Sequence, residues 1–339
     1  MTDTDTLIAT AKAMVVPGKG ILAVDESTET CTKRFAKFGI ESTKTSRRDY
    51  REMMFRAPGI GEFVSGAILY DETIRQDAAD GSRIVDVLND VGVLPGIKVD
   101  TGVKPLAGAP GETITEGLDG LRDRLAEYRE IGARFTKWRA VLKVSDETPS
   151  RNCIEKNAQA LGRYAALAQE AGLVPIVEPE VLMDGDHDIQ RCRVVTSQVL
   201  QATFEQLSAH RALLAGIVLK PNMVIAGSDC LRQATSAEIA ELTLATLREF
   251  VPDEVPGIAF LSGGQTGEEA CTNLDTMARR GDLPWELTYS FGRALQYPSL
   301  EIWGGSNGAD AQAALLHRAR MSSLARSGRY SAIEERAAV

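Results

Sequence analysis

The sequence lacks both a hydrophobic run long enough to cross a membrane and a pair of closely spaced cysteines. Its longest apolar stretch covers residues 212–219, far short of the roughly 18 residues that a membrane-spanning helix needs. The five cysteines are scattered and include no C-x-x-C pair, which excludes a disulfide framework and a cysteine zinc site and fits reduced thiols in a cytoplasm. The first residues, MTDTDTLIATAK, start acidic and show no targeting pattern.

Basic residues are also too few for a protein that binds polyanions. The chain has 38 basic and 47 acidic residues, a formal net charge of -9, so we expect neither a nucleic-acid nor a membrane partner. The three histidines, His187, His210 and His317, lie far apart without H-x-x-x-H spacing, so no metal site is expected. We expect His187, within the acidic string DGDHD, to lie in a solvated loop.

What the sequence does contain is a regular alternation of short apolar runs and amphipathic stretches from end to end. We expect buried parallel strands at its short apolar runs, residues 20–24, 63–70, 96–99, 134–143, 173–177, 216–219, 257–261 and 287–291. Amphipathic stretches lie between them, for example over 118–132, 152–172 and 237–250. Eight such units without a linker favour an α/β fold that closes into a (β/α)8 TIM barrel over a doubly wound sheet. We expect a single domain over residues 1–339, with a mobile C-terminal tail over 327–339.

A lysine stands at one of the predicted strand ends, where barrels of this kind carry their chemistry. Lys220 follows the apolar run GIVL and precedes Pro221, which ends the strand. Apolar surroundings disfavour an ammonium ion, and the free amine is a nucleophile. The structural alternative is a lysine whose stem packs along the strand end while its charge stays in water.

Two further lysines, Lys98 and Lys137, end other predicted strands. Three lysines converging on one space repel one another unless one is neutral, carboxylates intervene or an anion binds. For Lys137, the alternative role is a cation–π contact or stem packing beside Trp138.

Carboxylates stand at the same predicted edge. Asp25 ends the first strand, and Glu178 and Glu180 flank Pro179 in the string IVEPE. Side chains two residues apart on an extended segment point to the same side, so the two glutamates share a face. Carboxylates among lysines suit general acid/base catalysis, and a structural ion-pair network explains the pattern equally well.

A glycine-rich loop follows the seventh predicted strand. Ser262, Gly263 and Gly264 lead into TGEE at 266–269, and glycines let backbone N–H groups approach a phosphate. Thr266 and Glu269 also fit a capping box, and this acidic helix start disfavours a phosphate on the helix end itself. We therefore expect the phosphate against the loop and the Gly292–Arg293 segment, where the arginine adds charge-assisted hydrogen bonds.

At these residues the sequence closely resembles the class I, Schiff-base fructose-1,6-bisphosphate aldolases. The resemblance runs in order along nearly the whole chain through the strings GKGILAVDEST (18–28), GIKVDTGV (96–103), KWRAVLK (137–143), VEPEVLMDGDHD (177–188), LKPNMV (219–224), FLSGGQ (260–265) and FGRALQ (291–296). It implies a cytoplasmic homotetramer without a cofactor that reversibly cleaves fructose 1,6-bisphosphate into dihydroxyacetone phosphate and glyceraldehyde 3-phosphate.

The resemblance also implies catalytic roles. Lys220 would attack the ketone of the substrate, and the resulting iminium would accept electrons without a metal. Glu178 would be the main general acid/base, and Lys137 would assist iminium formation and bond cleavage. Asp25 would position or help deprotonate the C4 hydroxyl, and Glu180 would hold Lys137 and Lys220 in their charge states.

Substrate-binding residues follow in the same way. One phosphate would bind Ser262, Gly263, Gly292 and Arg293, with Gly264 beside them; the other would approach Ser27, Thr30, Arg34 and Lys98, and Arg139 would complete the set. Thr30 stands where animal members usually have a serine, and it keeps the hydroxyl. The sequence ends at Val339, soon after GRYSA, without the terminal tyrosine that animal members use for proton exchange at the enamine, so the group with that role stays open.

Three alternatives remain beside this reading. Sedoheptulose 1,7-bisphosphate presents the same phosphorylated ketose end as fructose 1,6-bisphosphate. A catalytically dead barrel that binds a phosphorylated ligand has no need of all five of Asp25, Lys98, Lys137, Glu178 and Lys220. A metal-dependent lyase is disfavoured because the sequence has no histidine cluster.

Overall fold

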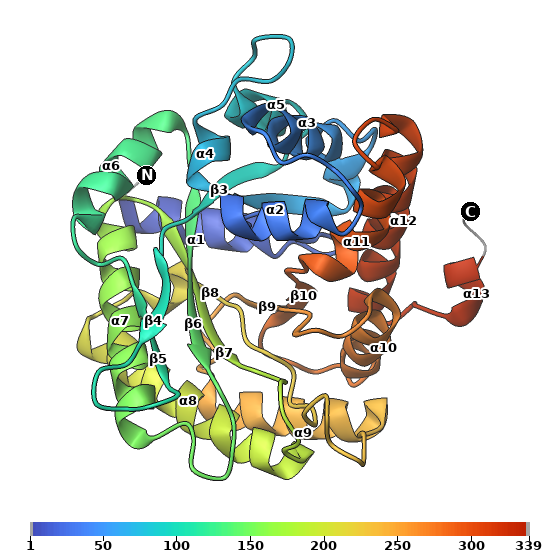
Figure 1. Cartoon of the computed structure of the whole chain (residues 1–339). Helices are drawn as coiled ribbons and strands as arrows, with labels where there is room; N and C mark the ends of the chain where they lie inside the picture. Colours follow the sequence, from blue (N-terminus) through green and yellow to red (C-terminus); the bar gives the residue numbers. More distant parts are fainter. Residues whose placement is uncertain (1–2, 337–339) are drawn as a thin grey trace.

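Eight parallel strands form the centre of the molecule, and helices surround them (Figure 1). The structure, a computed structural model, describes residues 3–336. In sheet order the strands are β1 (Gly20–Ala23), β2 (Val64–Leu69), β3 (Leu94–Lys98), β6 (Phe135–Leu142), β7 (Val174–Val181), β8 (Val218–Leu219), β9 (Gly257–Phe260) and β10 (Glu286–Tyr289). The Ala23 amide donates to the Phe291 carbonyl at 3.1 Å and so joins the two ends of the sheet. The predicted single-domain barrel is confirmed, and every expected strand segment overlaps one of these strands.

Helices follow the strands and cover their outer faces. They are α1 (Asp3–Met14), α2 (Thr28–Ala36), α3 (Lys44–Phe55), α4 (Asp71–Ile74), α5 (Ile84–Asp90), α6 (Leu121–Ile131), α7 (Arg151–Glu170), α8 (Ile189–Ala209), α9 (Ser236–Phe250), α10 (Gly267–Ala278), α11 (Arg293–Trp303), α12 (Gly308–Arg326) and α13 (Ala332–Arg336), with 3₁₀ turns at Ile60–Glu62 and Leu214–Gly216. Local sequence sets several of the starts: Thr235 with Glu238 and Thr266 with Glu269 form capping boxes at α9 and α10.

Apolar side chains fill the inside of the barrel at the amino ends of the strands. Phe135 is fully buried there beside strand residues and beside Leu7 and Met14 of α1. A Cβ added at Gly96 would lie 2.2 Å from the Phe135 ring, so only glycine leaves room for it. Because this end is closed by packing, the polar strand ends at the opposite rim are the open side of the barrel.

A two-stranded antiparallel hairpin interrupts the regular alternation after β3. Its strands are β4 (Gly102–Pro105) and β5 (Thr113–Glu116), which the sequence pattern did not predict. The Thr115 hydroxyl donates to the Arg139 carbonyl at 2.8 Å, so the hairpin lies against β6 near the carboxyl rim. None of the helices within residues 3–336 is both long and apolar enough to cross a bilayer.

The predicted tail, residues 327–339, contains the short helix α13 at the outer edge of the molecule (Figure 1). Glu335 of this helix forms an ion pair with Arg318 of α12 and lies 3.2 Å from His317 Nε2. Residues 337–339 lie outside the described part of the chain. The mobility of this segment stays a prediction.

Candidate active site

Two lysines and two carboxylates meet at the carboxyl rim of the barrel. Lys137 Nζ lies 2.6 Å from Asp25 Oδ2 and 3.3 Å from Glu178 Oε2. The other oxygen of Glu178, Oε1, lies 3.2 Å from Lys220 Nζ. The exposed fraction of the Lys137, Glu178 and Lys220 side chains is only 3%, 4% and 4%, respectively. The four groups therefore form a chain in which carboxylates and lysines alternate, with Glu178 between the two lysines.

Strand geometry explains why these side chains converge. Lys137 and Trp138 are neighbours on β6, so they point to opposite faces of the sheet. The Trp138 ring stacks on Tyr164 of α7 at 5.5 Å between centroids, which leaves Lys137 on the inner face. The Lys220 amide donates to the Val177 carbonyl at 2.8 Å and continues the β8 ladder by one residue before Pro221.

Electrostatics fixes two of the four protonation states. Burial would raise the pKa of Asp25, but Lys137, Lys220 and Lys98 together hold that pKa below its usual range. For Lys137, burial lowers the pKa, but the facing carboxylates of Asp25, Glu178 and Asp100 raise it above its usual range. Near neutral pH, Asp25 is therefore an anion and Lys137 a cation.

Glu180 lies one step nearer the mouth of the barrel than Glu178. Its Oε2 forms an ion pair with Arg139 Nε, and the exposed fraction of the Arg139 side chain is 40%. In the described residues, no ion pair joins Glu180 to Lys137 or Lys220. The carboxylate that contacts both lysines is Glu178. An influence of Glu180 on the charge states of Lys137 and Lys220, which the resemblance implied, stays a prediction.

Lys98 is held at the end of β3 by a residue that the sequence analysis did not single out. Its Nζ lies 2.7 Å from Asp100 Oδ1 and donates to the Asp100 carbonyl at 3.0 Å. Asp100 Oδ2 also accepts from the Arg139 amide at 3.3 Å. The signal for this role was an aspartate two residues after Lys98 in GIKVD, on the same side of an extended segment.

The glycine-rich loop after β9 lies beside the start of α11. Gly263 and Gly264 have φ angles of +54° and +85°, which only glycine adopts without strain. Arg293 Nη2 is 3.7 Å from the position of a Cβ added at Gly264, so the arginine side chain reaches the loop. The first turn of α11, which Gly292 precedes, has no acidic residue, whereas α10 begins with Glu268 and Glu269. Of the two helix starts, that of α11 is therefore the less repulsive to an anion, and a phosphate at the loop and this helix start stays a prediction.

A second cluster of candidate phosphate ligands lies at the start of α2. The Ser27 hydroxyl accepts a hydrogen bond from the Thr30 amide at 3.2 Å and donates to the Thr30 hydroxyl at 3.1 Å. Arg34 follows one turn later, and its Nη1 forms an ion pair with Glu26 Oε1. The helix therefore presents two hydroxyls and one guanidinium close to Asp25.

His187 lies in a loop, as expected, but its side chain is not solvated. The neighbouring aspartates Asp186 and Asp188 are exposed, but the His187 side chain is buried, and its carbonyl accepts from the Gly227 amide at 2.8 Å. The physical reason is that the loop after β7 packs against the loop after β8 and covers the ring. Across residues 3–336, no group of three or more His, Cys, Asp or Glu residues could hold a metal ion.

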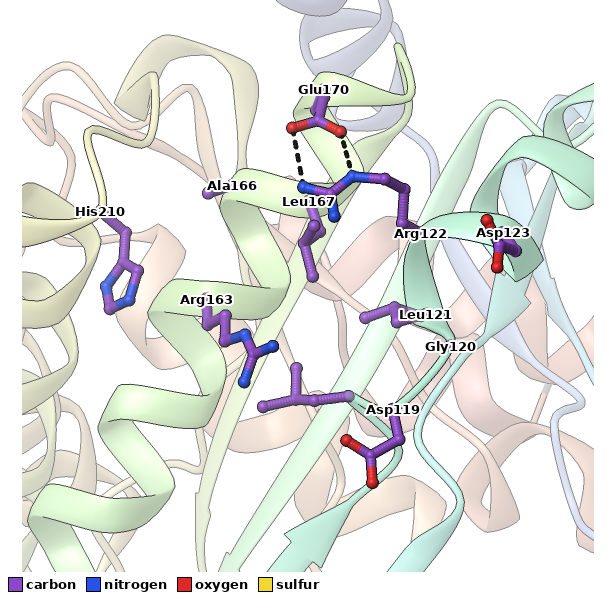
Figure 2. A pocket seen from close by; sticks show the side chains of 11 residues that line it. Asp119, Gly120, Leu121, Arg122, Asp123, Arg163, Ala166, Leu167, Glu170 and His210 are labelled. Carbon is purple, nitrogen blue, oxygen red and sulfur yellow. Dashed lines mark hydrogen bonds and ion pairs between the residues drawn. The ribbon is translucent and has the colours of Figure 1, made fainter.

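A separate pocket of about 460 Å³ lies outside the rim, between α6 and α7 (Figure 2). Arg163 and His210 line it, together with the Arg122–Glu170 ion pair at 2.6 Å. Lys137, Glu178 and Lys220 do not line this pocket. It is therefore distinct from the candidate active site.

Comparison with known proteins decides the family. The family model described as fructose-bisphosphate aldolase class-I, a glycolytic family, matches residues 6–339. The chain belongs to this family. It is a class I aldolase, a lyase of glycolysis, and the predicted family and enzyme class are confirmed.

Similar proteins from distant organisms match the aldolase over nearly its whole length. It is 52% identical over 327 residues to a probable fructose-bisphosphate aldolase class 1 of Xanthomonas campestris pv. campestris, covering 96% of this chain and 98% of that one. It is 50% identical over 335 residues to the Dictyostelium discoideum fructose-bisphosphate aldolase, covering 97% and 94%. The Plasmodium falciparum aldolase, solved with TRAP and a small-molecule inhibitor, superposes with a TM-score of 0.96 at 46% identity, covering 97% of this chain and 96% of that one.

Proposed function

We propose that this aldolase cleaves fructose 1,6-bisphosphate through a Schiff base on Lys220. The observation that carries the proposal is the position of Glu178 between the two buried lysines, 3.3 Å from Lys137 Nζ and 3.2 Å from Lys220 Nζ. Lys137 faces two carboxylates and Lys220 one. Because the nucleophile must be a neutral amine, this difference favours Lys220 for that role and Lys137 as the permanent cation.

The reaction can be followed through these groups. The Lys220 amine attacks the C2 carbonyl, and the carbinolamine loses water after Glu178, beside the Lys137 cation, supplies a proton, which leaves an iminium. The base removes the proton of the C4 hydroxyl, the C3–C4 bond breaks, and its electron pair moves into the iminium to form an enamine. Glyceraldehyde 3-phosphate departs, C3 takes a proton, and hydrolysis releases dihydroxyacetone phosphate and the free amine.

Asp25 and Glu178 are the candidate bases for the C4 hydroxyl. The Lys137 contact keeps Asp25 ionised and makes it a weak base, so Asp25 suits orienting the C4 hydroxyl as a hydrogen-bond acceptor. Glu178 contacts both lysines and suits proton transfer to and from the substrate atoms next to the Schiff base. Glu180 acts through Arg139 at the mouth.

Strand order supports the placement of the two phosphates. Lys220 follows β8 and Ser262 follows β9, the neighbouring strand, so the C1 phosphate, next to the ketone carbon, binds Ser262, Gly263, Gly264, Gly292 and Arg293. The C6 phosphate then lies at Ser27, Thr30, Arg34 and Lys98, with Arg139 between the two. Sedoheptulose 1,7-bisphosphate fits the same C1 subsite and is the alternative substrate.

Assembly and location belong to the same proposal. We infer a cytoplasmic location, supported by similarity to the cytosolic fructose-bisphosphate aldolase 4 of Arabidopsis thaliana, 51% identical over 327 residues. The homotetramer is what the resemblance to the family implies. Sedimentation should give four times the chain mass of 36.6 kDa.

Borohydride trapping tests the central step. Reduction in the presence of dihydroxyacetone phosphate should inactivate the aldolase irreversibly and label the peptide that contains Lys220. Lys220→Met should abolish the label, whereas Lys143→Met, which removes an exposed lysine just beyond β6, should leave it unchanged. A label on Lys98 or Lys137, or none, contradicts the assignment.

A further inference from the structure

Glu26 stands between two site residues, Asp25 and Ser27, and the proposed reaction does not use it. Its Oε1 accepts from two helices that are far apart in the sequence. Arg34 of α2 forms an ion pair with this oxygen, and Gln296 Nε2 of α11 donates to it at 2.8 Å. Only 9% of the Glu26 side chain is exposed.

Gln296 connects this carboxylate to the C1-phosphate subsite. It lies on α11 three residues after Arg293 and is buried. Its Nε2 also donates to the Ala23 carbonyl, and its Oε1 accepts from the Tyr50 hydroxyl at 3.2 Å. A side chain with these partners has little freedom, so α11 is fixed relative to the Glu26 carboxylate.

Arg34 connects the same carboxylate to the C6-phosphate subsite. The exposed fraction of its side chain is 23%, and in the part of the chain that the structure describes, Glu26 is its only ion-pair partner. A guanidinium has five N–H donors in a planar fork. The bond from Nη1 to Glu26 therefore orients the fork and leaves donors on it for a phosphate.

The backbone of Glu26 is held as well. Arg51, with 1% of its side chain exposed, donates from Nη2 to the Glu26 carbonyl at 2.7 Å. Glu26 is thus fixed at both its carbonyl and its carboxylate, by residues of α2, α3 and α11. Because Glu26 cannot move freely, its carboxylate holds Arg34 of α2 and Gln296 of α11 at a set distance from each other.

We propose that Glu26 is a positioning residue that sets the spacing between the two phosphate subsites and so favours bisphosphate over monophosphate substrates. The inference rests on the proposed function. A long, partly exposed arginine loses conformational freedom when it binds a phosphate, and a carboxylate that already holds it removes part of that cost.

The Glu26 carboxylate also has an opposing effect, because its negative charge repels a bound phosphate. Here Oε1 is satisfied by Arg34 and Gln296, and the side chain is mostly buried. Arg34 balances the charge of the Glu26 carboxylate on the side that faces the start of α2. Orientation of Arg34 therefore outweighs repulsion, which fixes the sign of the effect: loss of Glu26 weakens binding of the C6 phosphate.

Steady-state kinetics with two substrates test this. Fructose 1,6-bisphosphate uses both subsites, whereas fructose 1-phosphate lacks the C6 phosphate. Glu26→Ala should raise KM for the bisphosphate about tenfold, with KM for the monophosphate and both kcat values changed less than about twofold. The control is Glu29→Ala, which removes an equal charge from the same helix start, where Glu29 is 78% exposed and pairs with Lys33, and which should change nothing.

Several results would overturn the inference. An unchanged or lower KM for the bisphosphate shows that Glu26 does not position Arg34 or that repulsion prevails. An equal rise for both substrates, or a fall in kcat alone, places the role of Glu26 elsewhere. Glu26→Gln, which keeps an acceptor oxygen and the side-chain shape, guards against misfolding and should raise KM for the bisphosphate in the same direction but less.

Calorimetry with ketone-free ligands separates this inference from the proposed function. Glu26→Ala should bind hexitol 1,6-bisphosphate about tenfold more weakly than the unmodified aldolase and should bind hexitol 1-phosphate equally well. These ligands cannot form a Schiff base. If they behave as expected while Lys220 takes no label, the positioning role stands and the Schiff-base assignment fails; equal affinities in both proteins refute the positioning role alone.

Discussion

Replacing Glu178 by glutamine keeps the shape of the side chain and removes its charge and its ability to carry a proton. Both of its oxygens face lysines, at 3.3 Å from Lys137 Nζ and 3.2 Å from Lys220 Nζ. General acid/base groups typically contribute 10²–10⁴ in rate, which corresponds to about 3–5 kcal/mol in the barrier. We expect Glu178→Gln to lower kcat for fructose 1,6-bisphosphate by this factor.

The KM for the same substrate should change little, because neither proposed phosphate subsite includes Glu178. Removing one partner from a buried ion-pair network also destabilises a fold by about 3–5 kcal/mol, so the melting temperature should fall. The assay must therefore run well below that temperature, with circular dichroism as the check on folding.

Glu180→Gln is the informative comparison, because it removes a carboxylate two residues further along β7 that pairs with Arg139. Its effect on kcat should be clearly smaller than that of Glu178→Gln. Near-normal turnover in Glu178→Gln, or a larger loss in Glu180→Gln, would refute the reasoning and move the acid/base role to Glu180 or Asp25.

Three further predictions concern stability and the C-terminal segment. Asp25→Asn should lower the free energy of unfolding most above about pH 4, because the lowered pKa of Asp25 gives stability that is present above the usual carboxyl pKa and lost as the pH falls through the folded value. Denaturation across pH checks this, and a loss that grows toward low pH contradicts it. Deleting Ser331–Val339 should change kcat by less than about tenfold but lower the melting temperature, because Arg318, with 7% of its side chain exposed, loses Glu335. Tyr330→Phe should leave hydrogen exchange on dihydroxyacetone phosphate intact, because Asp275 and Arg279 bind the Tyr330 backbone beside α10; a selective loss of exchange would show that this phenol takes part in the proton exchange.

The strands were predictable because each is a short apolar run buried on both faces. The β4–β5 hairpin was not, because residues 102–116 carry glycines and prolines, and Val103 and Lys104 are exposed, so no alternating pattern marks it. Its position depends on tertiary bonds such as that from Thr115 to Arg139, which a local pattern does not reveal.

The convergence of Asp25, Lys137, Glu178 and Lys220 was predictable for a similar reason, since parallel strands end at one rim. Which of the two glutamates contacts the lysines was not predictable. In the register of β6 and β7, Glu178 lies opposite Arg139 and Glu180 opposite Val141, so the two glutamates share a face but sit at different heights. Height along the barrel, which the spacing of two residues does not specify, decides which carboxylate contacts the lysines.

The chain of charges also bears on the energetics of the Schiff base. With Lys220 as the neutral amine and Glu178 as a carboxylate, the set of Asp25, Lys137 and Glu178 carries one excess negative charge. Formation of the iminium on Lys220 adds one positive charge, and the set becomes neutral. Preorganised charges that match a developing charge stabilise it without rearrangement. With glutamine at position 178 the set is neutral beside the amine and positive beside the iminium, so the same substitution that removes the proton carrier also disfavours the intermediate. Borohydride trapping measures the amount of iminium separately from kcat. If Glu178→Gln traps less iminium than the unmodified aldolase, this second effect is present. If the yield is unchanged, the role of Glu178 is limited to proton transfer.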